Sequence, residues 1–328
     1  MSYAPKLLSP VAYVKDATKH IKNAKSDVYL LALVIASDQR TSGLIESLLE
    51  ASRRGVNVRV AADIFTYGDL GGFFLPTISR FKQSRLTTRM SQEFTRSGVK
   101  FSWLGRASSL IYSGRTHIKW CVVDDTVYSF GGVNLSKSHI ENYDFMFKIK
   151  SRELADKLIN EHQRLVRADV GGYSYPSHRF KYGNDTIMID GGLFGDSIIY
   201  RRACKLTKEA KDVIFVSQYC PTGKLSRLLK RVDAKLYFNP YANASAANKF
   251  AIFMGALISG QNTLYKKDRY LHAKFMIFYM PGGKRIALTG SHNFSNAGVV
   301  LGTREIALET EDPKIIDQLE TFLHEIQS

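Results

Sequence analysis

The stretch Thr116-His117-Ile118-Lys119 decides the fold, because it returns about half a chain later as Leu271-His272-Ala273-Lys274. In a β-strand successive side chains point to opposite faces, so the imidazole and the ammonium of each His-x-Lys triplet point the same way. A single triplet of this kind is common by chance. Each of these two is followed at a similar distance by Gly-(Gly/Ser)-x-Asn-x-Ser, at 131–136 and 290–295. The repetition predicts an internal duplication.

Helical and strand patterns alternate around both triplets. Near-continuous apolar runs at 27–34 and 213–217 are typical of buried strands, and amphipathic helical patterns flank both runs. This order predicts an α/β fold. We expect two similar halves, each a mixed, mostly parallel β-sheet flanked by helices, related by a pseudo-two-fold axis with the active site between them. The expected boundaries are 1–168 for the N-terminal half, 169–196 for a linker rich in Gly and Tyr, and 197–328 for the C-terminal half.

Composition narrows the class of partner and the compartment. The 328 residues are 45% hydrophobic, enough for a full core, and the net charge of +16 favours a polyanionic partner, either nucleic acid or an anionic membrane surface. Cys121, Cys204 and Cys220 have no spacing typical of a disulfide framework or a zinc site, which fits a reducing compartment. No signal peptide and no apolar run of membrane-spanning length is apparent. We expect a cytoplasmic protein, peripheral to the membrane at most.

The segment from Thr66 to Ser97 interrupts the alternation of strands and helices. It holds an apolar tip at Phe73-Phe74-Leu75 and then a helical pattern in which apolar residues alternate with cations. One interpretation is a surface helix whose apolar stripe packs on the core. The other is a basic amphipathic element that rests on anionic lipid. The residues of that second interpretation are Phe73, Phe74, Arg80, Lys82, Arg85 and Arg89.

The two motif copies together carry a recognisable chemistry. Each supplies an imidazole, an ammonium, an Asn amide and Ser hydroxyls, and these donors suit the oxygens of a phosphate group. Facing each other across a pseudo-dyad, they would surround one phosphodiester. One imidazole can then attack phosphorus while the other protonates the leaving oxygen. The paired Lys side chains would stabilise the developing charge, so we expect neither a metal ion nor a cofactor.

The motifs closely resemble those of the phospholipase D superfamily, and the resemblance spans nearly the whole chain. The first copy matches at every motif position, which are His117, Lys119, Asp124, Gly131, Gly132 and Asn134. The second copy matches at His272, Lys274, Gly290, Ser291 and Asn293. It departs at Tyr279, which stands where the family has Asp and which precedes a longer turn. The resemblance implies that Asp124 supports the fold, as do the motif glycines, and that the Tyr279 exchange affects local architecture more than activity.

Further roles follow from the resemblance. His117 is the expected nucleophile and His272 the expected acid and base, although the sequence leaves the reverse assignment open. The acids that orient the imidazoles are expected downstream of the motif Asn, with Asp144 serving His117 and Glu305 serving His272. The remaining candidates for catalysis or phosphate contact are Lys119, Lys274, Asn134, Asn293, Ser136, Ser295 and Ser291. His292, inside the second loop, is a further candidate for substrate contact.

Three functions are compatible with this site, because family and fold do not fix the substrate. The first is a phospholipid phosphatidyltransferase or phospholipase D, similar to the cardiolipin synthases, whose Gly-Gly-x-Asn form the first motif shares. The second is a nuclease, in which the positive charge of the protein would follow the phosphate backbone of the nucleic acid. The third is an inactive relative that binds polyanions. Both half-sites lie in one chain, which predicts a monomer, and we favour the phospholipid.

Overall fold

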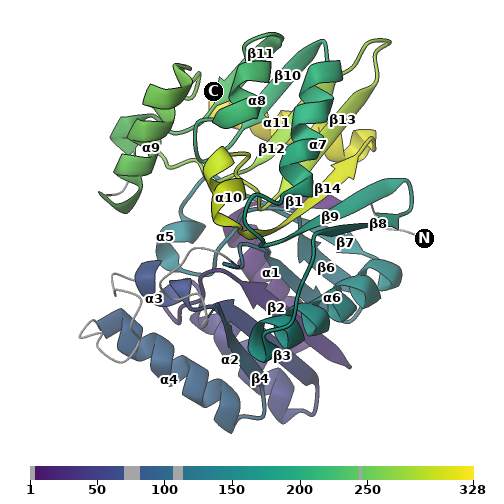
Figure 1. Cartoon of the computed structure of the whole chain (residues 1–328). Coiled ribbons are helices and arrows are strands. Elements are labelled where there is room, and N and C mark those ends of the chain that lie inside the picture. The colour runs from purple at the N-terminus through teal and green to yellow at the C-terminus, as the bar shows by residue number, and fades with distance from the viewer. Residues whose placement is uncertain (1–3, 70–81, 106–113, 244–245) are drawn as a thin grey trace.

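The computed structural model describes residues 4–69, 82–105, 114–243 and 246–328, which form two halves stacked on each other (Figure 1). Each half holds one seven-stranded β-sheet and one His-x-Lys motif. Helices flank both sheets. The predicted α/β class and its two similar halves are therefore confirmed.

The first sheet is built from the N-terminal strands. In spatial order these are β1 (Lys6–Leu8), β7 (Met146–Lys150), β6 (Thr126–Ser129), β5 (Trp120–Val123), β2 (Asp27–Ala32), β3 (Asn57–Asp63) and β4 (Lys100–Leu104). The second sheet runs β8 (His178–Tyr182), β9 (Asp185–Gly191), β14 (Arg304–Thr310), β13 (Arg285–Gly290), β12 (Phe275–Tyr279), β10 (Asp212–Val216) and β11 (Asp233–Tyr237). The order β7-β6-β5-β2-β3 thus repeats as β14-β13-β12-β10-β11, as a duplication requires.

The helices of the described residues divide between the halves. The first half holds α1 (Pro10–Lys22), α2 (Ser42–Arg53), α3 (Phe65–Asp69), α4 (Lys82–Arg96), α5 (Lys137–Ile140) and α6 (Arg152–Gly171). The second holds α7 (Ile198–Glu209), α8 (Gly223–Leu229), the 3-10 turn η1 (Tyr241–Asn243), α9 (Ala246–Ser259), α10 (Asn296–Leu301) and α11 (Pro313–Gln327). Capping residues determine where several helices begin. Ser151 accepts the N–H of Leu154 at 3.2 Å at the start of α6. Asp312 accepts the N–H of Lys314 at 2.9 Å at the start of α11, whose first residue is Pro313.

A central core joins the two halves. The centroid of the Phe145 ring in the first half lies 5.1 Å from the ring centroid of Phe322 and 6.0 Å from that of Phe275, both in the second half. Buried residues of α6 and α11 belong to the same cluster. Each sheet also carries an outer core, under α1 and α2 in one half and α7 and α8 in the other. The halves therefore pack through apolar side chains as one unit.

The expected predominance of parallel pairing is wrong. Only β2/β3, β3/β4 and β10/β11 pair in parallel among the described strands, and the remaining neighbours pair antiparallel. The apolar runs could not predict strand direction, because a strand covered by helices on both faces is continuously apolar whether its neighbours are parallel or antiparallel. Short turns such as Asp124–Asp125, which joins β5 directly to β6, could only connect antiparallel strands.

The segment expected to link the halves is largely structured. Its hairpin β8–β9 forms the edge of the second sheet, where Ile189 lies opposite Ile306 of β14. Helix α6 also continues to Gly171, beyond the expected end of the first half. The boundary between the two halves therefore remains a prediction, whereas 178–191 belongs to the second sheet.

Helix α4 packs as the first of the two interpretations predicts. Met90 and Phe94 are buried in the outer core of the first half, and Arg85 and Arg89 are exposed on the other side. Phe73, Phe74 and Arg80 lie outside the described residues, as does the side chain of Lys82. None of the helices in the described ranges is long and apolar enough to cross a bilayer.

Candidate active site

Both His-x-Lys motifs lie at the junction of the halves, and each is held there by the opposite half. Isolated β-bridges join Thr116 to Arg304 and Leu271 to Tyr143. The backbone N–H of His117 donates to the carbonyl of Arg304 at 2.9 Å, and that of His272 donates to the carbonyl of Tyr143 at 2.8 Å. Backbone pairing thus brings the two motifs to one place.

The histidine–carboxylate pairs cross between the halves. His117 Nδ1 lies 3.0 Å from Glu305 Oε1, and His272 Nδ1 lies 2.6 Å from Asp144 Oδ2. The prediction that each acid serves the histidine of its own half is therefore wrong. The β-bridges explain the crossing, because the residue before each acid, Tyr143 or Arg304, pairs with the residue before the opposite histidine. In each pair the carboxylate holds Nδ1 and so leaves Nε2 available for chemistry.

The two carboxylates are buried and charged. Burial would raise the pKa of Glu305, but the charge and hydrogen bond of His117 hold that pKa at about 2. Its oxygens also accept the hydroxyls of Ser291 at 2.5 Å and Thr303 at 3.0 Å. The pKa of Asp144 is lowered in the same way by His272, against burial.

The two imidazoles differ in access to solvent. The His117 side chain is 27% exposed, and that of His272 is 8% exposed. Burial, together with the nearby Lys274 ammonium, lowers the pKa of His272 to about 3 despite the opposing effect of Asp144. His272 is therefore neutral at neutral pH when no substrate is bound.

The two motif lysines form a buried cationic pair. Lys119 Nζ donates to the carbonyl of His117 at 2.7 Å, and Lys274 Nζ donates likewise to the carbonyl of His272. Burial lowers the pKa of Lys119 to about 8 and that of Lys274 to about 7, although Asp144 and Glu305 oppose the shift in both. Repulsion from the positive charge of Lys119 also lowers the pKa of Lys274. A bound anion would relieve that repulsion.

The motif asparagines leave polar atoms unsatisfied in both halves. Asn134 Oδ1 and Asn293 Oδ1 are buried and have no hydrogen-bond partner within the described part of the chain. Unsatisfied buried polar atoms are rare and costly, and here they occur at equivalent positions. A half-turn of either amide presents its Nδ2 donors instead. The pair is therefore suited to a polar ligand between the halves.

The serines proposed for phosphate contact have other partners. Ser136 Oγ lies 2.7 Å from His139 Nδ1, and Ser295 Oγ accepts the N–H of Gly298 at 3.4 Å to cap α10. Ser291 donates to Glu305, so its hydroxyl orients a carboxylate. Their roles toward substrate remain predictions.

Sequence reasoning missed two residues of the site. The His139 ring lies edge-on to that of His272, with centroids 5.7 Å apart, and Thr303 donates to Glu305. His139 follows Ser136 by one helical turn, and that spacing is the signal that could have identified it. Thr303 lies directly before β14, two residues ahead of Glu305, but resembles no motif residue.

His292 is held in the protein interior. Its Nδ1 accepts the N–H of Phe294 at 2.7 Å, and its Nε2 lies 3.4 Å from Ser197 Oγ and 3.9 Å from Asp190 Oδ2. Burial lowers the pKa of His292 to about 4, so the ring is neutral. Both ring nitrogens have protein partners, and the contact with substrate considered from its loop position is not supported.

The motif glycines and Asp124 have structural contacts. A Cβ at Gly131 would lie 1.8 Å from the carbonyl oxygen of Phe145, so only glycine lets these backbones approach. A Cβ at Gly290 would lie 2.0 Å from the corresponding oxygen of Ile306. The Asp124 carboxylate accepts backbone N–H groups of residues 25–27 at 2.9–3.0 Å and fixes the start of β2. Tyr279, its counterpart, donates instead to Glu320 of α11 at 2.7 Å.

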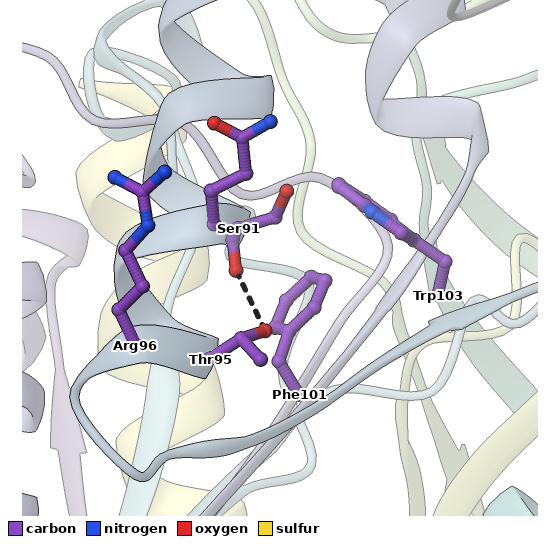
Figure 2. A pocket seen from close by; sticks show the side chains of 6 residues that line it. Ser91, Thr95, Arg96, Phe101 and Trp103 are labelled. Carbon is purple, nitrogen blue, oxygen red and sulfur yellow. Dashed lines mark hydrogen bonds between the residues drawn. The ribbon is translucent and has the colours of Figure 1, made fainter.

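Two surface cavities lie away from the motifs. One, of about 390 Å³, is lined by Ser91, Gln92, Thr95, Arg96, Phe101 and Trp103 between α4 and β4 (Figure 2). The other, of about 410 Å³, lies between α6 and the β3–β4 edge. Neither contains a motif residue. Among the described side chains, no group of three His, Cys, Asp or Glu could hold a metal ion.

Comparisons with known proteins agree with this geometry. Residues 17–166 and 224–326 match the family described as "Cardiolipin synthase, PLD-like domain". Cardiolipin synthase B of Salmonella typhi and that of Salmonella typhimurium are each 26% identical over 158 residues, which cover 44% of this chain and 34% of the relative. The chain thus matches about a third of the length of these curated relatives.

Solved structures share the fold at low identity. Phosphatidylserine synthase of Haemophilus influenzae superposes with a TM-score of 0.71 at 15% identity, over 100% of this chain and 88% of that one. Polyphosphate kinase of Porphyromonas gingivalis gives 0.60 at 16% identity, over 98% of this chain and 50% of that one. The family match covers both motif copies and most of the residues between them. The chain therefore belongs to the phospholipase D-like domain family, as its paired His-x-Lys motifs predict.

Proposed function

We propose that this chain transfers or hydrolyses phosphodiesters of phospholipids through a covalent phosphohistidine intermediate. The observation that carries the proposal is the crossed pairing of His117 with Glu305 and His272 with Asp144. It puts two oriented imidazoles and two buried ammonium groups at one junction. Membership of a family described by cardiolipin synthase favours the phospholipid as substrate.

In the first step, His117 Nε2 attacks phosphorus. A phosphorus–nitrogen bond forms, and the bond from phosphorus to the leaving alcohol breaks as His272 gives that oxygen a proton. His272 is neutral in the free protein, so it must gain this proton when substrate binds. The negative phosphodiester would raise its pKa, and Asp144 would stabilise the imidazolium.

In the second step, His272 takes a proton from the incoming alcohol or water. The activated oxygen attacks phosphorus, the bond to His117 breaks, and the neutral imidazole is regenerated. Lys119 and Lys274 stabilise the charge on the phosphoryl oxygens throughout, and the Asn134 and Asn293 amides add neutral donors. An alcohol acceptor gives a new phosphodiester and water gives hydrolysis. A monomer at the cytoplasmic membrane surface is part of the same proposal.

A nuclease is the alternative that a specific observation favours, namely the net charge of +16. Purified full-length protein in EDTA would be incubated with phosphatidylglycerol vesicles and, separately, with single-stranded DNA. We expect phosphatidic acid or cardiolipin from the vesicles and no cleavage of the DNA. His117→Asn should abolish the product, and His324→Asn, at an exposed histidine of α11, is the matched control. DNA cleavage without lipid product would replace the proposal with the nuclease.

A further inference from the structure

Helix α9 buries one face and leaves an apolar face uncovered. Ile252 and Ser259 are buried against the second half, and Ser259 Oγ lies 2.8 Å from Cys220 Sγ. Phe253, Leu257 and Ile258 are 51%, 66% and 69% exposed. Spacings of four and five residues place these three side chains on one side of the helix. An exposed stripe of large apolar side chains indicates a partner.

The uncovered face extends beyond the helix itself. Tyr241 of η1 is 54% exposed, and its ring lies 6.1 Å from that of Phe253. Leu264, which follows the helix, is 51% exposed. In Figure 1, α9 stands out from the second half, on the same side of the molecule as α5 and α10. Helix α9 therefore projects from the second half.

Cations lie beside this face. The stretch 223–271, which contains α9, carries nine Lys or Arg and only two Asp. Lys249 is exposed and lies over the Tyr241 ring at 5.6 Å. Lys230 Nζ comes within 3.7 Å of where a Cβ at Gly260 would stand, beside the end of α9. An apolar stripe with a basic border matches the chemistry of an anionic lipid surface, whose acyl boundary takes the apolar side chains and whose headgroups take the cations.

The same face is connected to the active site. Asn243 of η1 donates to the carbonyl of Lys267 at 2.5 Å, and the nearby Arg269 guanidinium lies over the Tyr143 ring at 4.3 Å. Tyr143 in turn accepts the N–H of His272. These contacts link η1, which carries Tyr241 of the apolar face, to the segment that holds His272.

We propose that α9 docks this protein on anionic phospholipid bilayers, with Phe253, Leu257 and Ile258 entering the interface and Lys230 and Lys249 contacting headgroups. The inference rests on the proposed function for the identity of the bilayer lipid as substrate. It moves the docking surface to the second half, away from the basic helix α4, whose apolar residues Met90 and Phe94 pack on the core.

The test compares vesicle binding by two full-length variants. Phe253→Ser/Leu257→Ser/Ile258→Ser removes the apolar face. Val170→Ser/Tyr173→Ser, at positions 67% and 68% exposed near the end of α6, is the matched control. Co-sedimentation uses vesicles of phosphatidylglycerol and phosphatidylcholine, and melting curves check that each variant is folded. We expect at least about tenfold weaker binding for the triple variant and wild-type binding for the control.

Each other outcome is decisive. Equal vesicle binding by the triple variant and the control would overturn the docking proposal. A wild-type dimer that becomes a monomer in the triple variant, with no vesicle binding by either, would assign the face to a second copy of the chain and also overturn it. Binding that depends on α9 without any lipid turnover would leave the docking surface standing and refute the proposed function.

Discussion

The two half-sites share a motif but hold their histidines differently. The Glu305 carboxylate, paired with the more exposed His117, accepts side-chain hydroxyls from Ser291 and Thr303. The Asp144 carboxylate, paired with the buried His272, accepts the backbone N–H groups of Gly132 at 3.1 Å and Phe145 at 2.8 Å.

Gly132 and Ser291 occupy the same motif position, so the difference in acid and the difference in loop are coupled. The shorter side chain of Asp144 accepts the backbone N–H of Gly132, where a Cβ would clash with the carboxylate. The longer side chain of Glu305 accepts the hydroxyl of Ser291 instead. Duplication supplied two copies, and these contacts distinguish them.

The largest effect is expected from the removal of one imidazole, which tests whether the two half-sites act together. If both act on one phosphorus, His117→Asn and His272→Asn should each reduce the rate by about 10³-fold to 10⁴-fold. Steady-state rates on vesicles measure this, with melting curves to show that the variants fold. A variant that kept about half of the wild-type rate would mean two independent sites.

The Gly132–Ser291 difference is the next target. A Cβ at Gly132 would stand 2.7 Å from Asp144 Oδ2 and 2.8 Å from the carbonyl oxygen of His272. Gly132→Ala should therefore displace the His272 pair and lower kcat by about 10²-fold. Ser291→Ala removes one donor to Glu305 and should lower kcat by about tenfold. Equal effects of the two substitutions, measured as kcat at saturating lipid, would mean that the loops do not differ as described.

A double-mutant cycle on the free energy of unfolding tests which carboxylate is the partner of each histidine. Substituting Ala at His117 and Glu305, singly and together, should give a coupling energy of about 1 kcal/mol or more. The same cycle for His117 and Asp144 should give less than about 0.5 kcal/mol, because these residues are not partners. Denaturant titration of the variants measures both. Coupling only in the His117–Asp144 cycle would restore pairing within each half.

The lysine pair predicts a pH dependence of smaller size. An ammonium is charged below its pKa and neutral above it, and the pKa is about 8 for Lys119 and about 7 for Lys274. Binding of sulfate, whose charge is constant in this range, should weaken by about fivefold to tenfold between pH 6 and pH 9. Lys274→Arg stays charged and should flatten the change, and Lys284→Arg on the surface should not. Calorimetric affinities that do not vary with pH would contradict the assigned charges.

The sequence predicted the half-sites better than their assembly. The repeated His-x-Lys and Gly-(Gly/Ser)-x-Asn patterns predicted the residues now found at the junction of the halves. The triplets themselves, expected in strands, lie directly before β5 and β12. Sequence order alone could not show that Asp144 serves His272, because that pairing arises from backbone bridges between segments more than a hundred residues apart. Thr303 belongs to no motif, and a contact made only in three dimensions carries no local pattern, whereas the helical spacing of His139 from Ser136 was a signal that went unused.

The sequence did not predict strand direction or the proposed docking surface on α9. Apolar continuity at 27–34 indicates burial and says nothing of direction. Apolar residue type does not show which side of a helix is covered, and only their exposure distinguishes Phe253, Leu257 and Ile258 of α9 from Met90 and Phe94 of α4.

The central claim is that both histidines serve one phosphorus, and covalent trapping tests it most directly. Quench of a single turnover with a radiolabelled phosphodiester in alkaline detergent, in which the phosphorus–nitrogen bond survives, followed by peptide mapping at alkaline pH, counts the labelled histidines. We predict one phosphohistidine per chain, on His117, absent from His117→Asn and retained in His272→Asn when the leaving group needs no proton. Label on both His117 and His272 of the same molecule, or on neither, would contradict the account.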